Sequence, residues 1–152
     1  MDWEGMVHAL ADARRLLKPA GVLVDIHPLP VPPVIAVHRE GRCVFSEVCP
    51  SQGAEAYRQA DRALDEAVQR QEFAPEQGTV FDFLTHAPSV TALDDHLTAT
   101  SAFDQEPGDP EAEMLWAELF KRADGAAGAR TSGVEVILLE KARMTTLRPL
   151  PW

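Results

Sequence analysis

The residues best suited to chemistry are Asp25 and His27, which stand two apart at the end of the short apolar run 22–26. Residues two apart on a strand share a face, so the carboxylate could orient the imidazole as a general base. Pro28 follows directly, and the carboxyl ends of strands in open α/β sheets are where ligands bind. The competing interpretation is a pair of polar groups that cap loop amides where the strand ends. The sequence leaves both open.

Metal and thiol chemistry have weaker support. His38 would complete an Asp/His/His set with Asp25 and His27 of the kind that zinc accepts. Nothing in the sequence fixes His38 in space, and histidines in hairpins are usually just exposed, so no metal site is predicted. Cys43 and Cys49 lack the C-x-x-C spacing of metal or redox sites and are predicted to be reduced thiols.

A third group of candidates is aromatic. Phe81, Phe83 and Trp116 could line a hydrophobic pocket for a flat small molecule. Core packing is the competing interpretation, because buried aromatic side chains stabilise a domain of this size. No catalytic residue is assigned. The candidate ligand-binding residues are Asp25, His27, Pro28, His38, Phe81, Phe83 and Trp116.

The elements that must position these residues follow from hydrophobic patterning. An amphipathic helix ends before Pro19 and Gly21, and the unalternating run 22–26 predicts a central strand that is covered on both faces. Two β-prone runs around Gly41 predict a hairpin over 34–46. A helix is predicted over 53–72 with Ser51 as N-cap, followed by a short strand or arm over 79–84. Two further helices begin near Ser89 and at Asp109-Pro110-Glu111, and a break follows over 125–128. The last element is a strand from Val134 to Leu139 that runs on toward Met144 and lies beside the first strand.

Composition limits the class of protein. The chain has 152 residues, of which 45% are hydrophobic and 25% charged, so one domain over 1–152 is predicted. The formal net charge of -10 argues against binding to nucleic acid or anionic membranes, which call for clustered basic residues. No apolar run reaches the roughly 20 residues of a membrane span. Asp2 and Glu4 stand where a signal peptide would be basic, so the prediction is a cytoplasmic protein.

Residues 14–25, RRLLKPAGVLVD, resemble the class I S-adenosylmethionine-dependent methyltransferases. In that family a helix ending in Leu-Lys-Pro-Gly-Gly leads into the fifth strand, and here Ala20 replaces the first of those glycines. The strand from Gly133 to Met144 is similar to the family's final strand. The resemblance implies an α/β fold that corresponds to the second half of this Rossmann-like family, with a small mixed sheet and four helices on its faces.

The family's glycine-rich cofactor turn has no counterpart, because the nine glycines never form G-x-G-x-x-G after a strand. The resemblance therefore implies a methyltransferase-like protein without its own S-adenosylmethionine site, acting as a non-catalytic binding or interaction module with no cofactor on the isolated chain. The alternative is a small-molecule methyltransferase whose cofactor half comes from another polypeptide or across a dimer. A third possibility is a carrier of a small ligand.

The resemblance also predicts a partner. The strand that would lie beside 22–27 is missing, which leaves a long apolar edge with unpaired amides and carbonyls. Such an edge should be covered. The prediction is a homodimer that joins these edges, a swap of the N-terminal helix, or a partner protein.

Overall fold

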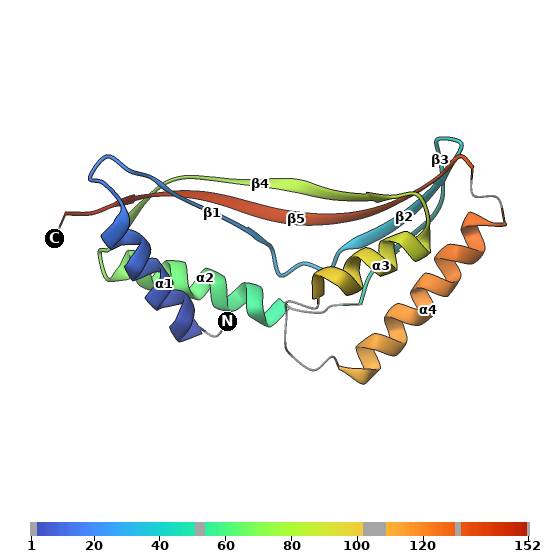
Figure 1. Cartoon of the computed structure of the whole chain (residues 1–152), viewed down its shortest axis with the longest axis horizontal. Coiled ribbons are helices and arrows are strands. Elements are labelled where there is room, and N and C mark those ends of the chain that lie inside the picture. Colours follow the sequence, from blue (N-terminus) through green and yellow to red (C-terminus); the bar gives the residue numbers. More distant parts are fainter. Residues whose placement is uncertain (1–2, 51–53, 102–108, 130–131, 152) are drawn as a thin grey trace. The chain divides into compact units, whose positions relative to one another are not determined.

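The computed structural model of the chain describes residues 3–50, 54–101, 109–129 and 132–151. These residues form a mixed α/β structure with four helices and five strands (Figure 1). The helices are α1 (Trp3–Leu16), α2 (Ala54–Gln69), α3 (Val90–Ser101) and α4 (Pro110–Ala127). The strands are β1 (Leu23–Pro28), β2 (Val34–Arg39), β3 (Arg42–Val48), β4 (Phe73–Ala87) and β5 (Val134–Pro149).

The five strands form one open antiparallel sheet in the order β1-β5-β2-β3, and β4 pairs with β5. The 16-residue strand β5 is central, because its residues 142–147 pair with β1 and its residues 134–139 pair with β2. The predicted α/β class and the pairing of the first and last strands are confirmed. The predictions of a mixed sheet and of a central β1 are wrong. The length of β5 explains the difference, since a single long strand has room for two short ones along the same edge.

Contacts divide the chain into two compact units. Unit 1 comprises residues 1–31, 53–82 and 141–152, and unit 2 comprises residues 32–52 and 83–140. The unit boundary falls within β4 and within β5. One domain over 1–152 stays a prediction.

Unit 1 is built around a small core in which Ala67, Phe73 and Leu147 are buried. Apolar side chains of α1 and α2 pack against this core, and the two helices contact each other. Gly21 makes the turn from α1 to β1: its amide donates to the Lys18 carbonyl at 2.8 Å, and an added Cβ would lie only 3.0 Å from that oxygen. The predicted end of the helix before Pro19 and Gly21 is thus confirmed.

Unit 2 contains the predicted hairpin. β2 and β3 are joined at Glu40 and Gly41, which have φ angles of 50° and 76°. The left-handed conformation suits glycine, which has no Cβ to clash. The predicted caps of the later helices are also confirmed, since the Ser89 hydroxyl accepts from the Ala92 amide at 3.0 Å and the Asp109 carboxylate accepts from the Glu111 amide at 3.0 Å.

In each unit the helices contact one side of the strands. In unit 2, Ile35 and Val37 of β2 alternate into a core with Leu93 of α3 and Leu119 of α4, and Val136 of β5 joins them. The prediction of helices on both faces is therefore wrong within each unit. β4 is also much longer than the predicted arm over 79–84, and α4 continues through the predicted break as far as Ala127. The predicted N-cap Ser51 lies outside the described residues.

Candidate functional site

Asp25 and His27 of β1 lie in contact in unit 1. The Nδ1 atom of His27 is 2.6 Å from Oδ2 of Asp25, and the His27 residue is only 8% exposed. Alternation along β1 turns both side chains toward α2, on the side opposite Val24 and Ile26. The shared face that the spacing predicted is confirmed. A role for the two residues in ligand binding stays a prediction.

The second ring nitrogen of His27 is also occupied. His27 Nε2 lies 3.0 Å from Oδ1 of Asp61, and Arg143 Nη1 donates to the same oxygen at 2.9 Å. Asp61 belongs to α2, and Arg143 of β5 is the register partner of His27. We call these four residues, Asp25, His27, Asp61 and Arg143, the Asp61 cluster. Sequence reasoning missed both residues, because Arg143 is placed by an antiparallel register and Asp61 by the packing of α2 against β1, and no local motif encodes either.

The geometry of the Asp61 cluster suits a structural role better than proton transfer. A general base needs a nitrogen within reach of a substrate proton, and both nitrogens of His27 are taken by carboxylates of the chain. The cluster connects β1, α2 and β5 through the contacts of His27 with two carboxylates and the hydrogen bond from Arg143 to Asp61.

The strand-end argument for a ligand site does not hold in this sheet. It rests on parallel strands whose carboxyl ends meet around a crevice. Here β1 is antiparallel to its neighbour, and the half-buried Pro28 lies opposite Ala142 within β5 rather than beside another strand end. Pro28 therefore has no support as a ligand residue from its place in the sheet.

His38 is in unit 2, whereas Asp25 and His27 are in unit 1. His38 pairs in register with Glu135 of β5. The Oε1 atom of Glu135 also lies 2.8 Å from Nδ1 of His86 on β4. Within the described parts of the chain, no group of three or more histidine, cysteine, aspartate or glutamate side chains is placed to hold a metal ion. The structure thus brings together the Asp25 and His27 of the hypothetical zinc set within one unit and leaves His38 in the other.

The aromatic candidates have two different environments. Trp116 packs against the core of unit 2 beside Phe120, with ring centroids 5.4 Å apart, as the core interpretation expects. Phe81 and Phe83 lie two apart on β4 and are 36% and 52% exposed. Burial therefore explains Trp116, whereas the two phenylalanines of β4 are exposed.

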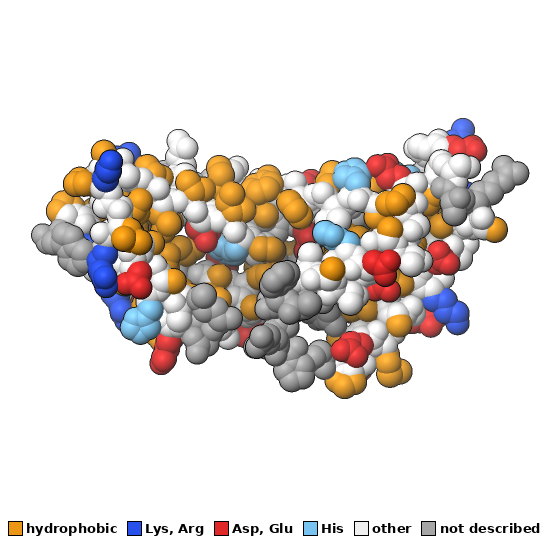
Figure 2. Space-filling model, viewed as in Figure 1, with side chains coloured by type: hydrophobic (Ala, Val, Ile, Leu, Met, Phe, Trp, Pro, Cys, Tyr) orange, Lys and Arg blue, Asp and Glu red, His pale blue; other side chains and the backbone are white. Residues whose placement is uncertain are grey.

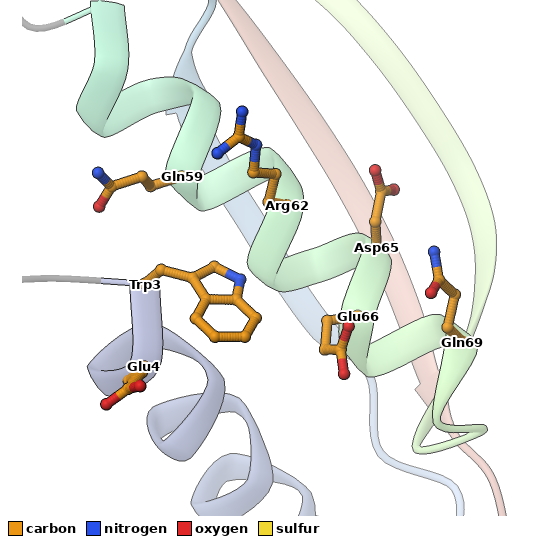
Figure 3. A pocket seen from close by; sticks show the side chains of 7 residues that line it. All are labelled: Trp3, Glu4, Gln59, Arg62, Asp65, Glu66 and Gln69. Atoms are coloured by element: carbon orange, nitrogen blue, oxygen red, sulfur yellow. The ribbon is translucent and has the colours of Figure 1, made fainter.

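A groove that the sequence did not predict lies between α1 and α2 in unit 1 (Figure 3). It has a volume of about 680 Å³, and the indole of Trp3 points toward α2 across it. Its other lining residues are Glu4, Gln59, Arg62, Asp65, Glu66 and Gln69. Small-molecule sites are mostly apolar with a few polar groups, so this charged groove does not match the expected pocket for a flat molecule.

The two cysteines are free, as predicted. Cys43 is exposed, whereas Cys49 is buried, and burial raises the pKa of the Cys49 thiol to about 12. The thiolate is the reactive form, so Cys49 stays protonated and inert at neutral pH.

We therefore expect one thiol per chain to react with a disulfide reagent at pH 8 in the native protein, and a second to react only in denaturant. Colorimetric thiol counting with and without urea measures this difference. Rapid reaction of both thiols in the native protein would contradict the buried position of Cys49.

Comparisons with known proteins give no match: no family model, curated protein or solved structure is similar to this chain. The resemblance of residues 14–25 to class I methyltransferases accordingly stays a prediction. In the described portion of the chain, none of the helices combines the length and the apolar character that crossing a membrane requires.

Proposed function

We propose that this chain is a non-catalytic interaction module whose binding surface is the side of β1 that faces away from α2 in unit 1. Three residues define this β1 surface: Val22, Val24 and Ile26, with exposed fractions of 40%, 52% and 59%. Contiguous exposed apolar residues mark interaction sites, because leaving them in water is unfavourable. The exposure of this row is the observation that carries the proposal.

The register of the sheet extends the β1 surface. Val24 lies opposite Thr146 and Ile26 lies opposite Met144, and paired residues of antiparallel strands point to the same side. Figure 2 shows hydrophobic side chains gathered over the strands of unit 1 on the side away from its helices. The β1 surface thus continues onto β5 instead of ending at the strand.

The contacts of His27 in unit 1 support a non-catalytic role. Both nitrogens of His27 are bonded within the Asp61 cluster, so the best candidate base of the sequence has no nitrogen to offer a substrate. The sequence also lacks a glycine-rich turn that would hold the methyl donor. The resemblance to a methyltransferase rests on residues 14–25 and on the strand from Gly133 to Met144.

Calorimetric titration separates this proposal from a working methyltransferase. We expect S-adenosylmethionine to give no heat beyond dilution with the isolated chain. Tight stoichiometric binding would reject a non-catalytic module that lacks a methyl-donor site.

The proposed surface is tested by placing a photo-reactive amino acid at position 26 in the chain expressed in cells. The matched control carries it at position 114, because Met114 of α4 is 74% exposed and lies outside the β1 surface. We expect a covalent adduct with another protein chain from position 26 and none from position 114. No adduct from position 26, or the same adducts from both positions, would contradict the proposed surface.

A further inference from the structure

We infer that the partner of the β1 surface is a second copy of this chain, which adds its own β1 antiparallel to the open edge of β1. This inference rests on the proposed function and names its partner. Among the described residues, β1 pairs with β5 alone, so one edge of this strand carries no strand partner. An open apolar edge is a template for pairing with another strand.

The backbone groups on the open edge follow from one hydrogen bond. The Leu29 amide donates to the Lys141 carbonyl of β5 at 2.7 Å. In an antiparallel ladder, alternate residues direct both backbone groups to the same neighbour. Asp25 and His27 therefore direct their backbone toward β5, whereas Val24 and Ile26 direct theirs toward the open edge.

Pro28 limits how a second strand can bind. Its backbone also faces the open edge by the same alternation, and proline has no N–H to donate. The edge therefore offers complete donor and acceptor pairs at Val24 and Ile26 but only an acceptor at Pro28. A strand that binds here must be short, and its residue opposite Pro28 must not need an N–H donor from that position.

A two-fold axis centred on Ile26 meets these conditions. Ile26 then lies opposite Ile26 of the second copy and exchanges both backbone hydrogen bonds with it. The Val24 amide of each chain donates to the Pro28 carbonyl of the other. The apolar β1 surfaces of the two copies become continuous on one side of the joined sheet.

Charge favours a second copy in this register. On the side that faces α2, Asp25 of one chain lies across from His27 of the other, so each carboxylate faces an imidazole rather than a second carboxylate. A register centred on Asp25 would instead place two carboxylates directly opposite each other, which is destabilising. Two chains of net charge -10 repel at a distance, and the Ile26-centred register keeps the two Asp25 carboxylates from lying directly opposite each other.

Sedimentation equilibrium of the purified full chain tests this inference with Ile26→Lys and the control Met114→Lys. We expect the wild type and Met114→Lys to be dimers. Ile26→Lys should raise the dissociation constant at least about 100-fold, because the two-fold axis brings two ammonium groups together in an apolar contact. Matching far-ultraviolet circular dichroism spectra of the three proteins would show that the exposed substitutions leave the fold intact, since loss of the dimer by itself lowers the melting temperature.

The register is tested by cross-linking on a Cys43→Ser background. A short thiol-specific cross-linker should join Ile26→Cys chains into dimers, whereas Val24→Cys should react poorly, because the two positions 24 lie several residues apart along the paired strands. Preferential cross-linking through position 24 would overturn the Ile26-centred pairing.

A wild-type protein that is monomeric at its highest soluble concentration would overturn the inference that the partner is a second copy. If position 26 still bound a different protein in cells, the proposed function would stand without this inference.

Discussion

Replacing Asp61 with alanine is expected to lower the free energy of unfolding by about 2–3 kcal/mol. One oxygen of the carboxylate accepts from Arg143 at 2.9 Å and lies 3.0 Å from Nε2 of His27. Its removal leaves Nε2 of a ring that is 8% exposed without a partner, and water has little access to replace it. The half-exposed Arg143 can regain water, so most of the loss comes from His27.

Asp65 provides the matched control. It lies on the same helix and is exposed, so Asp65→Ala should change stability by no more than about 0.5 kcal/mol. Urea unfolding followed by circular dichroism measures both variants. Equal midpoints for Asp61→Ala and Asp65→Ala would contradict the structural role of the Asp61 cluster.

Phe73→Ala should have the largest effect in unit 1, a loss of about 3–5 kcal/mol. Phe73 is 1% exposed and packs with Ala67 and Leu147 in a core of few residues, so its removal leaves a cavity that little else can fill. Phe83→Ala, on the same strand but 52% exposed, should cost less than about 1 kcal/mol.

Thermal unfolding by calorimetry distinguishes these two substitutions. A Phe83→Ala variant as unstable as Phe73→Ala would mean that Phe83 is covered in solution. A small effect of Phe73→Ala would show that the core of unit 1 lies elsewhere.

Local features were predictable because short-range chemistry decides them. Gly41 marked the hairpin through its tolerance of positive φ, and Ser89 and Asp109 marked helix starts because their side chains accept backbone amides. Pro19 and Gly21 marked the end of α1, and the structure adds that a side chain at position 21 would crowd Lys18.

Long-range features were not predictable, because they depend on which strands pair. The apolar run of β1 suggested a strand covered on both faces, yet β1 has an exposed row at Val24 and Ile26. An apolar run has the same pattern whether its second face is covered by a helix or by another chain. The antiparallel pairing of β1 with β5 sets the position of Arg143, and the packing of α2 sets that of Asp61, so these two members of the Asp61 cluster could not be found from the sequence.

The site was therefore predicted in part. Asp25 and His27 were paired correctly, since a spacing of two on a strand fixes their shared side. Their chemical role was not determined, because it depends on whether Nε2 of His27 is free, and Asp61 of a distant helix decides that. Trp116 illustrates the same limit, as composition alone cannot tell a pocket wall from a core residue.

Amide hydrogen exchange along β1 tests most directly whether the open edge is an interaction surface. The account predicts that the Asp25 and His27 amides, which face β5, are protected at every protein concentration. The Val24 and Ile26 amides should be protected in the concentrated wild type and exchange rapidly on dilution, and the Val24 amide should exchange rapidly in Ile26→Lys at all concentrations. Two results together would contradict an interaction surface at this edge. In the wild type, all four amides would be equally protected at every concentration, and in Ile26→Lys the protection of the Val24 amide would be unchanged.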